Sequence, residues 1–220
     1  MSIDQNIRET RQRIAKACER AGRSPEEITL VAVSKTVDAG MIEAAYRAGI
    51  TDFGENRVQD ALIKVEQLRS LRPGLKWHMV GHLQTNKART AASNFDIIHS
   101  VDSLRLAETL NRCAGKIQAF VQVNIALEDT KGGFPVSELD GAIKHITSLP
   151  NIEVKGLMTI APLASDAEQV RPYFRELKRI GDALGLKGLS MGMTDDFEVA
   201  IEEGATCVRI GRAIFGAGPA

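Results

Sequence analysis

The segment LVAVSKT, residues 30–36, joins four apolar residues to a serine, a lysine and a threonine. A continuous apolar run bounded by polar residues is typical of a buried strand in a parallel sheet. Lys35 follows at the point where this strand leaves the core. Burial disfavours the charged form of a lysine, and the neutral amine that results can condense with an aldehyde. The alternative is a lysine that emerges at the end of the strand and points into solvent.

The pattern of a strand followed by a helix repeats along the rest of the chain. Apolar runs alternate with segments whose apolar residues recur at helical spacing. An amphipathic helix over residues 3–22 precedes the first strand. Pro172 falls within the last long helical segment, where it must lie in the first turns or kink the helix. The expected strands are 28–35, 51–56, 77–82, 95–101, 117–125, 152–160, 188–192 and 206–211, and the expected helices between them are 38–48, 57–69, 85–92, 103–110, 136–147, 167–184 and 195–203.

This succession of elements predicts the fold class. Strands that are each followed by a helix, or by the last residues of the chain, predict a single α/β domain over residues 1–220, a (β/α)8 barrel with an extra N-terminal helix. An open, doubly wound sheet is the alternative. It is disfavoured because the first strand is not followed by a glycine-rich phosphate turn.

The composition is that of an ordinary soluble protein. The 28 Lys plus Arg balance 28 Asp plus Glu, so the charge gives no reason to expect nucleic acid or an anionic membrane as a partner. No apolar run approaches the length of a membrane span, and the N-terminal segment is charged throughout. Cys18, Cys113 and Cys207 are far apart, which argues against a disulfide framework and favours a reducing, cytoplasmic compartment. The four histidines lack metal-binding spacing, so no metal site is expected.

Glycine and threonine follow the last two expected strands. Gly192 and Thr194 lie in SMGMTDD (190–196) at the turn into a helix, and Gly211 directly follows the eighth strand. Glycine lets backbone amides approach an anion, a threonine hydroxyl can donate to it, and barrels commonly bind phosphate in these two loops. Ordinary turn chemistry is the alternative for either loop alone. The two loops together, opposite Lys35, predict a phosphate site.

Arg209 lies in the eighth strand two residues before Gly211, so its side chain points into the barrel with that loop. It forms either a buried salt bridge, for which Glu55 is the candidate partner and also the expected acidic neighbour of the site, or a contact with an acceptor on a ligand. The functional interpretation needs a ligand with an aldehyde for Lys35, a phosphate for the two loops and an acceptor for Arg209. Pyridoxal 5′-phosphate carries all three groups.

Several segments together resemble the pyridoxal-phosphate homeostasis protein family, over nearly the whole length of the chain. They are VAVSKT with Lys35, DFGENRVQ with Asn56, WHMVGHLQTNK, residues 124–133, GLMTI, LSMGM and VRIGRAIFG. The resemblance implies a single barrel similar to the N-terminal domain of alanine racemase, with pyridoxal 5′-phosphate as its cofactor. One departure is Thr194, where the family more often has serine, but the hydroxyl is kept.

The resemblance also implies roles for individual residues. By it, Lys35 forms the internal aldimine, Asn56 lies near the cofactor ring, and Arg209 faces the pyridine nitrogen. The phosphate is then held by Ser190, Met193, Thr194 and Gly211. The complete implied cofactor site is Lys35, Asn56, Met158, Ser190, Gly192, Met193, Thr194, Arg209 and Gly211.

The implied role of Arg209 bears on catalysis. A guanidinium donates to the ring nitrogen and leaves it unprotonated, which weakens the ring as an electron sink. Racemisation also needs acid and base groups on both faces of the substrate carbon. Racemases of this fold, by the resemblance, take one such group, a tyrosine, from a second domain. This chain is expected to end with its barrel, and its tyrosines, Tyr46 and Tyr173, fall within predicted helices as outer-layer packing.

Two functions therefore stay open. The first is a carrier without catalysis of its own that holds pyridoxal 5′-phosphate and releases it, with PLP-dependent apo-enzymes as possible acceptors. The second is a weak amino-acid racemase with His82 as second base. A monomer is expected, because racemases of this fold dimerise partly through the second domain.

The sequence gives less chemical evidence about the remaining polar candidates. Lys87 and Arg89 form either a basic spot for a second anion or partner protein, or a solvated helix face. Lys131 lies in a variable loop, and its role is open. Among the histidines, His78 and His99 are expected to point inward or into an interface, with satisfied hydrogen bonds, and His145 to lie on a helix surface.

Overall fold

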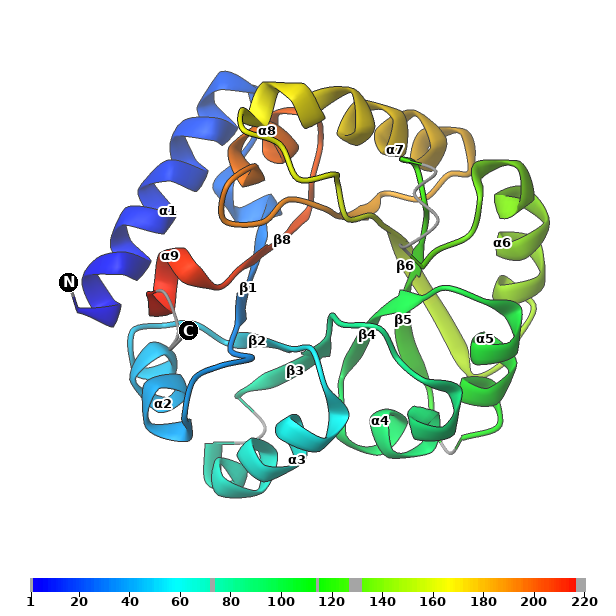
Figure 1. The fold of residues 1–220 in the computed structure, drawn as a ribbon, viewed down its shortest axis with the longest axis horizontal. Helices are drawn as coiled ribbons and strands as arrows, with labels where there is room; N and C mark the ends of the chain where they lie inside the picture. The colour runs from blue at the N-terminus through cyan, green and yellow to red at the C-terminus, as the bar shows by residue number, and fades with distance from the viewer. Residues whose placement is uncertain (1, 72–73, 114, 127–131, 217–220) are drawn as a thin grey trace.

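The computed structural model describes residues 2–71, 74–113, 115–126 and 132–216. The strands in these ranges are β1 (Thr29–Val33), β2 (Asp52–Glu55), β3 (Lys76–Met79), β4 (Ile97–Val101), β5 (Ile117–Gln122), β6 (Ile152–Met158), β7 (Gly188–Ser190) and β8 (Cys207–Ile210). They close into a parallel barrel in sequence order, with β8 paired to β1, and helices surround them (Figure 1). The predicted (β/α)8 barrel with an additional N-terminal helix is confirmed.

Three of the helices in the described ranges begin at a residue whose side chain caps them. The helices are α1 (Ile3–Arg20), α2 (Ala39–Arg47), α3 (Val58–Gln67), α4 (Ala88–Asn94), α5 (Leu104–Asn111), α6 (Leu139–Thr147), α7 (Arg171–Ala183), α8 (Phe197–Glu202) and α9 (Arg212–Phe215). Ser2, Asp38 and Ser103 accept a backbone N–H at the start of α1, α2 and α5. Pro172 lies in the first turn of α7, as predicted, where a missing N–H costs no helical bond. Within the described ranges, no helix is both long and apolar enough to traverse a lipid bilayer.

Several strands are shorter than the apolar runs that predicted them. β3 ends at Met79 and β6 at Met158, although the next residues, Val80 and Thr159, are also buried. Val80 and Thr159 still donate a backbone N–H to a neighbouring strand, to Glu55 at 2.9 Å and to Ser190 at 3.2 Å, so only the regular pairing ends there. Apolar patterning therefore located the buried segments but not the last paired residue of each strand. The short helix α9 was not predicted, since four residues are too few to show a helical period.

The N-terminal helix α1 is bound to the last two helices of the chain. It packs against α8 and α9 (Figure 1). The Asn6 side-chain amide donates to the backbone oxygen of Ile214 in α9 at 2.8 Å. Arg13 donates to the carboxylate of Glu198 in α8 at 2.9 Å. The extra helix thus fixes the two helices that follow the loops after β7 and β8.

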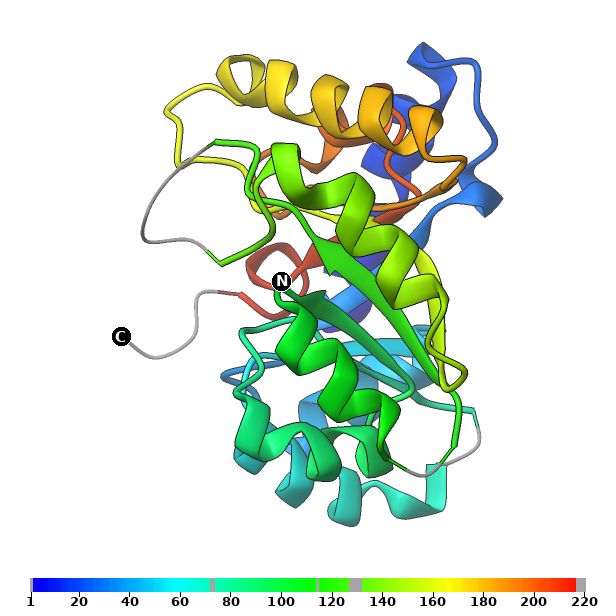
Figure 2. The same ribbon diagram turned by 90° about the vertical axis from the view of Figure 1, so that its right-hand side faces the viewer.

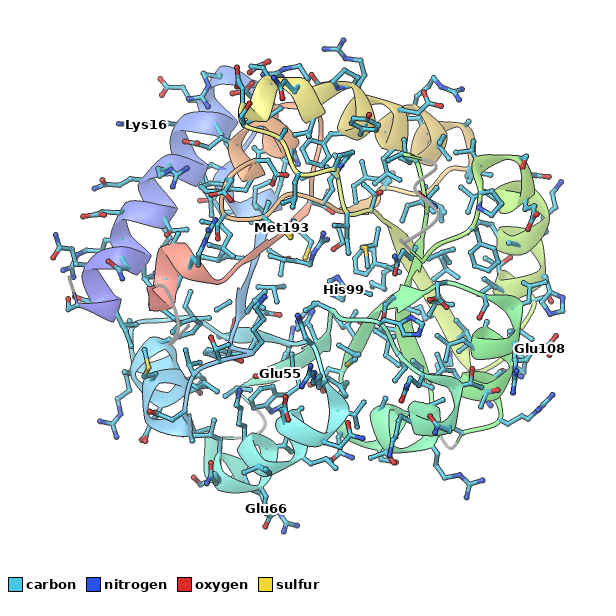
Figure 3. All side chains as sticks on the ribbon, viewed as in Figure 1. Lys16, Glu55, Glu66, His99, Glu108 and Met193 are labelled. Atoms are coloured by element: carbon cyan, nitrogen blue, oxygen red, sulfur yellow. The ribbon has the colours of Figure 1, made fainter. Side chains whose placement is uncertain are left out.

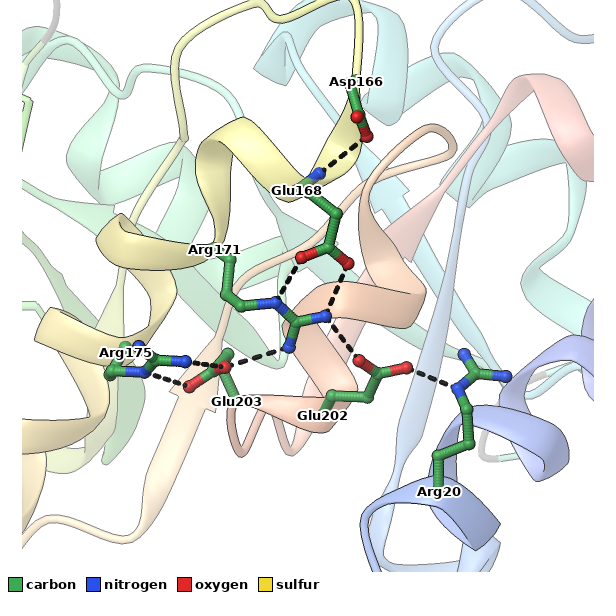
Figure 4. A network of polar contacts seen from close by, with 7 residues as sticks. All are labelled: Arg20, Asp166, Glu168, Arg171, Arg175, Glu202 and Glu203. Atoms are coloured by element: carbon green, nitrogen blue, oxygen red, sulfur yellow. Dashed lines mark hydrogen bonds and ion pairs between the residues drawn. The ribbon is translucent and has the colours of Figure 1, made fainter.

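A network of ion pairs joins α7, α8 and α1 on the outside of the barrel (Figure 4). Arg171 donates to Glu168 at 2.6 Å and to Glu202 at 2.7 Å. It also donates to Glu203 at 2.9 Å. Hydrogen bonds from Arg171, above all the one to Glu168, raise the pKa of the Arg171 guanidinium. Arg20 of α1 donates to the other oxygen of Glu202 at 2.6 Å. Charges that share partners in this way stabilise a surface more than isolated pairs do.

Candidate functional site at the carboxyl ends of the strands

A cavity of about 820 Å³ opens where the strands lead into the loops before the helices. This volume is in the usual range for a small-molecule site. The connection from β6 to α7 contributes to its rim, and Figure 2 shows this segment projecting from the end of the barrel. Six predicted site residues line the cavity: Lys35, Asn56, Met193, Thr194, Arg209 and Gly211. The other lining residues are Val33, Val80, Gly81, His82, Gln122, Gly132, Ile160, Leu163, Asp195 and Arg212.

Three predicted site residues are not among those that line the cavity. Met158 and Ser190 are fully buried at the ends of β6 and β7, where they pair in register. Gly192 is buried in the turn that follows β7. Direct contact of these three residues with a ligand stays a prediction. Ser190 nevertheless touches Arg209, which does line the cavity.

Lys35 lies two residues beyond the end of β1. Ser34 is still buried and donates its backbone N–H to the oxygen of Gly54 at 2.9 Å, but the side chain of Lys35 is exposed. The expectation of an amine enclosed by the core is therefore wrong, because the strand ends before it. Lys35 instead stands on the cavity wall, where an incoming ligand can reach its amine.

A buried charge pair fixes the segment that leads to Lys35. Lys64 of α3 donates to Glu55 at 2.8 Å and to the backbone oxygen of Ser34 at 2.6 Å. The Ser34 hydroxyl donates to the same Glu55 oxygen at 2.6 Å. Glu55, labelled in Figure 3, is only 1% exposed. The proposed salt bridge between Glu55 and Arg209 is therefore wrong: Lys64 is the partner of Glu55, and Glu55 supports the site from the core instead of lining it.

Arg209 reaches the cavity from inside the barrel. Its side chain donates to the Ser190 hydroxyl at 2.6 Å and to the backbone oxygen of Thr159 at 2.9 Å. Burial lowers the pKa of Arg209, although a guanidinium keeps its proton even so. Both direct partners are neutral, so the positive charge of Arg209 is not cancelled by a bonded carboxylate among the described residues. This charge is available to an acceptor in the cavity.

Gly192 allows α8 to pack close to the end of β7. Its φ of +91° is in the left-handed region, and a Cβ atom there would lie 2.6 Å from the Cβ of Ala200. The glycine is thus required for packing, whereas the sequence suggested close approach to an anion. The next amide, of Met193, donates to the carboxylate of Asp196 at 2.6 Å. Burial raises the pKa of Asp196.

The remaining donors of these two loops suit an anion. Within the described ranges, the backbone N–H groups of Thr194 and Gly211 have no protein acceptor. Arg212 pairs with Asp195 and so links the loop after β7 to the loop after β8. The cavity wall carries the amine of Lys35 and the guanidinium groups of Arg209 and Arg212, against one carboxylate, on Asp195. This donor set fits a phosphate group.

The sequence interpretation missed Arg212 and Asp195. Both are exposed charged residues, which are common on any surface. One signal could have found Arg212, because a basic residue directly follows the glycine at the end of the eighth strand.

His82 and Asp102 form a pair at the cavity. Nδ1 of His82 lies 2.9 Å from Oδ2 of Asp102. The side chain of Asp102 is 12% exposed and that of His82 is 67% exposed. A carboxylate at Nδ1 fixes the tautomer of a histidine and leaves Nε2 to accept a proton. His82, which lines the cavity, therefore has the arrangement of an acid–base group.

The other sequence candidates lie away from the cavity or outside the described residues. Lys87 is half-buried in a neighbouring pocket that also contains Asn56 and His82, whereas Arg89 is exposed on α4. Lys131 lies outside the described residues. As expected, Tyr46 and Tyr173 pack on the core from outer helices, His145 is exposed on α6, and His78 and His99 are buried and hydrogen-bonded.

Comparisons with known proteins agree with this geometry. The family model described as "Alanine racemase, N-terminal domain" matches residues 2–219. The pyridoxal phosphate homeostasis protein of Aquifex aeolicus (strain VF5) is 44% identical over 226 residues, which cover 98% of each chain. The chain belongs to the pyridoxal phosphate homeostasis protein family. The Escherichia coli (strain K12) member of this family is 43% identical over 98% of the present chain and 96% of its own.

Solved structures extend the family relation to three dimensions. PipY of Synechococcus elongatus PCC7942, solved with PLP bound, is 37% identical and superimposes with a TM-score of 0.87 over 98% of this chain and 100% of PipY. Alanine racemase of Corynebacterium glutamicum is 20% identical and gives a TM-score of 0.70 over 98% of this chain and 61% of its own. The second likeness shows the fold alone. Membership of the homeostasis protein family confirms the prediction made from the motifs.

Proposed function

We propose that residues 1–220 act as one unit that binds pyridoxal 5′-phosphate reversibly and passes it to acceptors. The observation that carries this proposal is the meeting of an accessible amine, a buried guanidinium and two amide-bearing loops in one cavity. The relatives named for pyridoxal phosphate homeostasis, and PipY with PLP bound, support the choice of ligand.

Each part of the cavity has a distinct task in this proposal. The amine of Lys35 condenses with the aldehyde to form a carbon–nitrogen double bond, a Schiff base, and releases one water; addition of water reverses the reaction. The amides of Thr194 and Gly211 bind the phosphate, together with Arg212. Arg209 donates to the ring nitrogen, and Asn56 lies beside the ring. The ligand supplies an electron-withdrawing ring, which this donor leaves unprotonated.

A carrier fits these residues better than a strong catalyst. A ring nitrogen that accepts from a guanidinium stays unprotonated and stabilises a carbanion poorly. Free thiols at Cys18, Cys113 and Cys207 support a reducing compartment such as the cytoplasm. We propose that the carrier works as a monomer and delivers its ligand to PLP-dependent apo-enzymes.

A weak amino-acid racemase is the second candidate. The observation in its favour is the His82–Asp102 pair at the cavity, which provides an acid–base group besides Lys35. An assay of amino-acid racemisation over a panel of substrates separates the two candidates. Turnover far above that of free pyridoxal 5′-phosphate, and lost in His82→Ala, supports the racemase and contradicts a purely carrier role.

The ligand assignment is tested by reduction and mapping. The protein is incubated with pyridoxal 5′-phosphate, reduced with borohydride and digested, and the pyridoxyl group is located by mass spectrometry. The label is expected on Lys35, and Lys35→Ala should lose both the label and the visible absorbance band. The matched control is Lys16→Ala, on the exposed face of α1 (Figure 3), which should retain both. A label at another lysine, or none, contradicts the proposed site.

A further inference from the structure

A chain of hydrogen bonds crosses the interior of the barrel and ends at Arg209. Arg209 donates to the Ser190 hydroxyl at 2.6 Å. The Ser190 oxygen lies 2.8 Å from Nδ1 of His99, and Nε2 of His99 lies 2.9 Å from Nδ1 of His78. Nε2 of His78 lies 2.9 Å from Oδ1 of Asp52. We call these five residues the polar chain.

The polar chain is shielded from solvent over most of its length. Its members come from β8, β7, β4, β3 and β2, and His99 lies near the middle of the ring of strands (Figure 3). Ser190 and His99 are 0% exposed, and His78 is 1% exposed. The His99 ring also packs on Phe120, with 4.7 Å between ring centroids. Hydrogen bonds in such an interior are strong when every partner is satisfied and costly when one is not.

One assignment of donors gives every bond of the polar chain a donor and an acceptor and leaves both histidines neutral. Arginine only donates, and an ionised carboxylate only accepts. In this assignment the Ser190 hydroxyl accepts from Arg209 and donates to Nδ1 of His99. His99 then donates from Nε2 to Nδ1 of His78, and His78 donates from Nε2 to Asp52. Each member between the ends accepts one bond and donates one, so both histidines are neutral and both carry their proton on Nε2.

The groups around the polar chain favour this assignment. Burial above all lowers the pKa of His99 well below its usual value, and the nearby charge of Arg209 acts in the same direction. Burial raises the pKa of the Cys207 thiol, which adjoins Ser190, to about 11, so this thiol stays protonated. Burial opposes ionisation of Asp52, but hydrogen bonds from His78 and Thr51 and the nearby charge of Lys76 lower its pKa.

We propose that the polar chain positions Arg209, and that His99 and His78 serve this purpose as neutral Nε2–H tautomers. Ser190 and the backbone oxygen of Thr159 hold the guanidinium from inside the barrel, while the charge of Arg209 faces the cavity. An added proton on either histidine would place a donor where the polar chain needs an acceptor. The statement that Arg209 donates to the ring nitrogen of the ligand rests on the proposed function. The assignment of the histidine tautomers does not depend on it.

The first test needs no ligand. The protein is labelled with 15N in its histidines, and the ring nitrogens are assigned with the variants His78→Gln and His99→Gln. At neutral pH, both His78 and His99 are expected to show a protonated Nε2 and an unprotonated Nδ1. A proton on Nδ1 of either ring, or an imidazolium, overturns the proposal whether or not the protein binds pyridoxal 5′-phosphate.

The second test separates positioning from general damage. His99→Phe interrupts the polar chain and keeps a ring against Phe120. It should weaken the binding of pyridoxal 5′-phosphate about tenfold, the size of a lost charge-assisted hydrogen bond. Binding of the 1-deaza analogue, which has no ring nitrogen to accept from Arg209, should change less than about twofold. Equal weakening for both ligands overturns the proposal, and His145→Phe on exposed α6 is the control.

A second pair of variants covers the case in which His99→Phe does not fold. Asp52→Asn keeps an oxygen that accepts from His78, whereas Asp52→Ala removes it. Pyridoxal 5′-phosphate should bind Asp52→Asn more tightly than Asp52→Ala, and the opposite order overturns the proposal. If the unaltered protein binds neither pyridoxal 5′-phosphate nor its analogue, the proposed function fails. The 15N measurement of the histidine tautomers then still tests the proposal about the polar chain.

Discussion

The ammonium of Lys64 lies 2.6 Å from the backbone oxygen of Ser34, one residue before Lys35. The same ammonium neutralises Glu55, which is 1% exposed. A helix on the outside of the barrel thus sends a cation inward to hold the segment that carries Lys35, the residue proposed to bind the ligand. Removing that cation leaves a buried carboxylate without its partner.

Lys64→Met is therefore expected to lower the free energy of unfolding by about 3–5 kcal/mol, because Glu55 stays buried and loses its cation. Urea denaturation measures the change. Lys16→Met, on the exposed face of α1, should change it by less than about 0.5 kcal/mol. Adding Glu55→Gln to Lys64→Met should recover part of the loss, since no charge is then buried. Equal effects of the Lys64 and Lys16 variants would contradict the buried pair.

Gly192→Ala should destabilise the protein by about 1–3 kcal/mol, because alanine is strained at a positive φ and its Cβ would meet Ala200. Gly141→Ala is the matched control. Gly141 lies in the first turn of α6, and a Cβ there meets nothing within 4 Å. Gly141→Ala should raise the free energy of unfolding by up to about 1 kcal/mol, because alanine has a higher helix propensity than glycine. Thermal unfolding of both variants gives the comparison, and a neutral Gly192→Ala would rule out the packing role.

Asp196 predicts a pH dependence of stability. Burial raises its folded-state pKa above the unfolded value near 3.8, so its ionisation opposes folding. This cost is absent below the unfolded pKa, grows as the pH rises and is complete above the folded-state pKa. Asp196→Asn keeps an acceptor for the Met193 amide and removes the charge. Its stability relative to the unaltered protein should be higher at neutral pH than near pH 4.

The Asp196 prediction is checked by urea denaturation at several pH values. The difference between variant and unaltered protein removes the contribution of the other carboxylates. A difference that stays constant would show that folding does not shift the pKa of Asp196, and one that grows as the pH falls would show a shift in the opposite direction.

Arg171→Ala should lower the free energy of unfolding by about 1–2 kcal/mol, since three carboxylates lose a shared cation. Arg179→Ala provides the control on the same helix. Arg179 is exposed and pairs with Glu176 alone among the described residues, so its loss should stay below about 0.5 kcal/mol. High salt should reduce the difference in free energy of unfolding between the two variants, because it screens the ion pairs. Calorimetry in low and high salt tests both statements.

Sequence patterning predicted the architecture because local signals repeat in this fold. Strands such as β1 and β5 are apolar runs, and several helices have an apolar face and a recognisable boundary. Strand ends were less predictable: β3 and β6 end at Met79 and Met158, although Val80 and Thr159 beyond them are also buried. The last paired residue depends on neighbouring strands, which single-sequence patterns do not describe.

The cavity was predicted in part for a similar reason. Lys35, Thr194 and Gly211 were found because polar residues at strand ends meet at one face of a barrel. The partner of Glu55 was not found, since Lys64 reaches it from a different element. The contact between His78 and His99 likewise depends on how β3 and β4 align, which the residues of either strand alone do not specify.

The attachment of α1 to α8 and α9 makes the N-terminal and C-terminal parts of the chain depend on each other. β1 pairs with β8, and Asn6 bonds to Ile214, so the seam of the barrel is closed by residues about as far apart in sequence as the chain allows. The loops expected to bind phosphate flank this seam. The loop after β8 begins at the strand that closes the ring, and Arg212 links it to the loop after β7. Ligand binding therefore reports that the ring has closed, and any weakness at the seam should appear as lost affinity before the helices on the opposite side unfold.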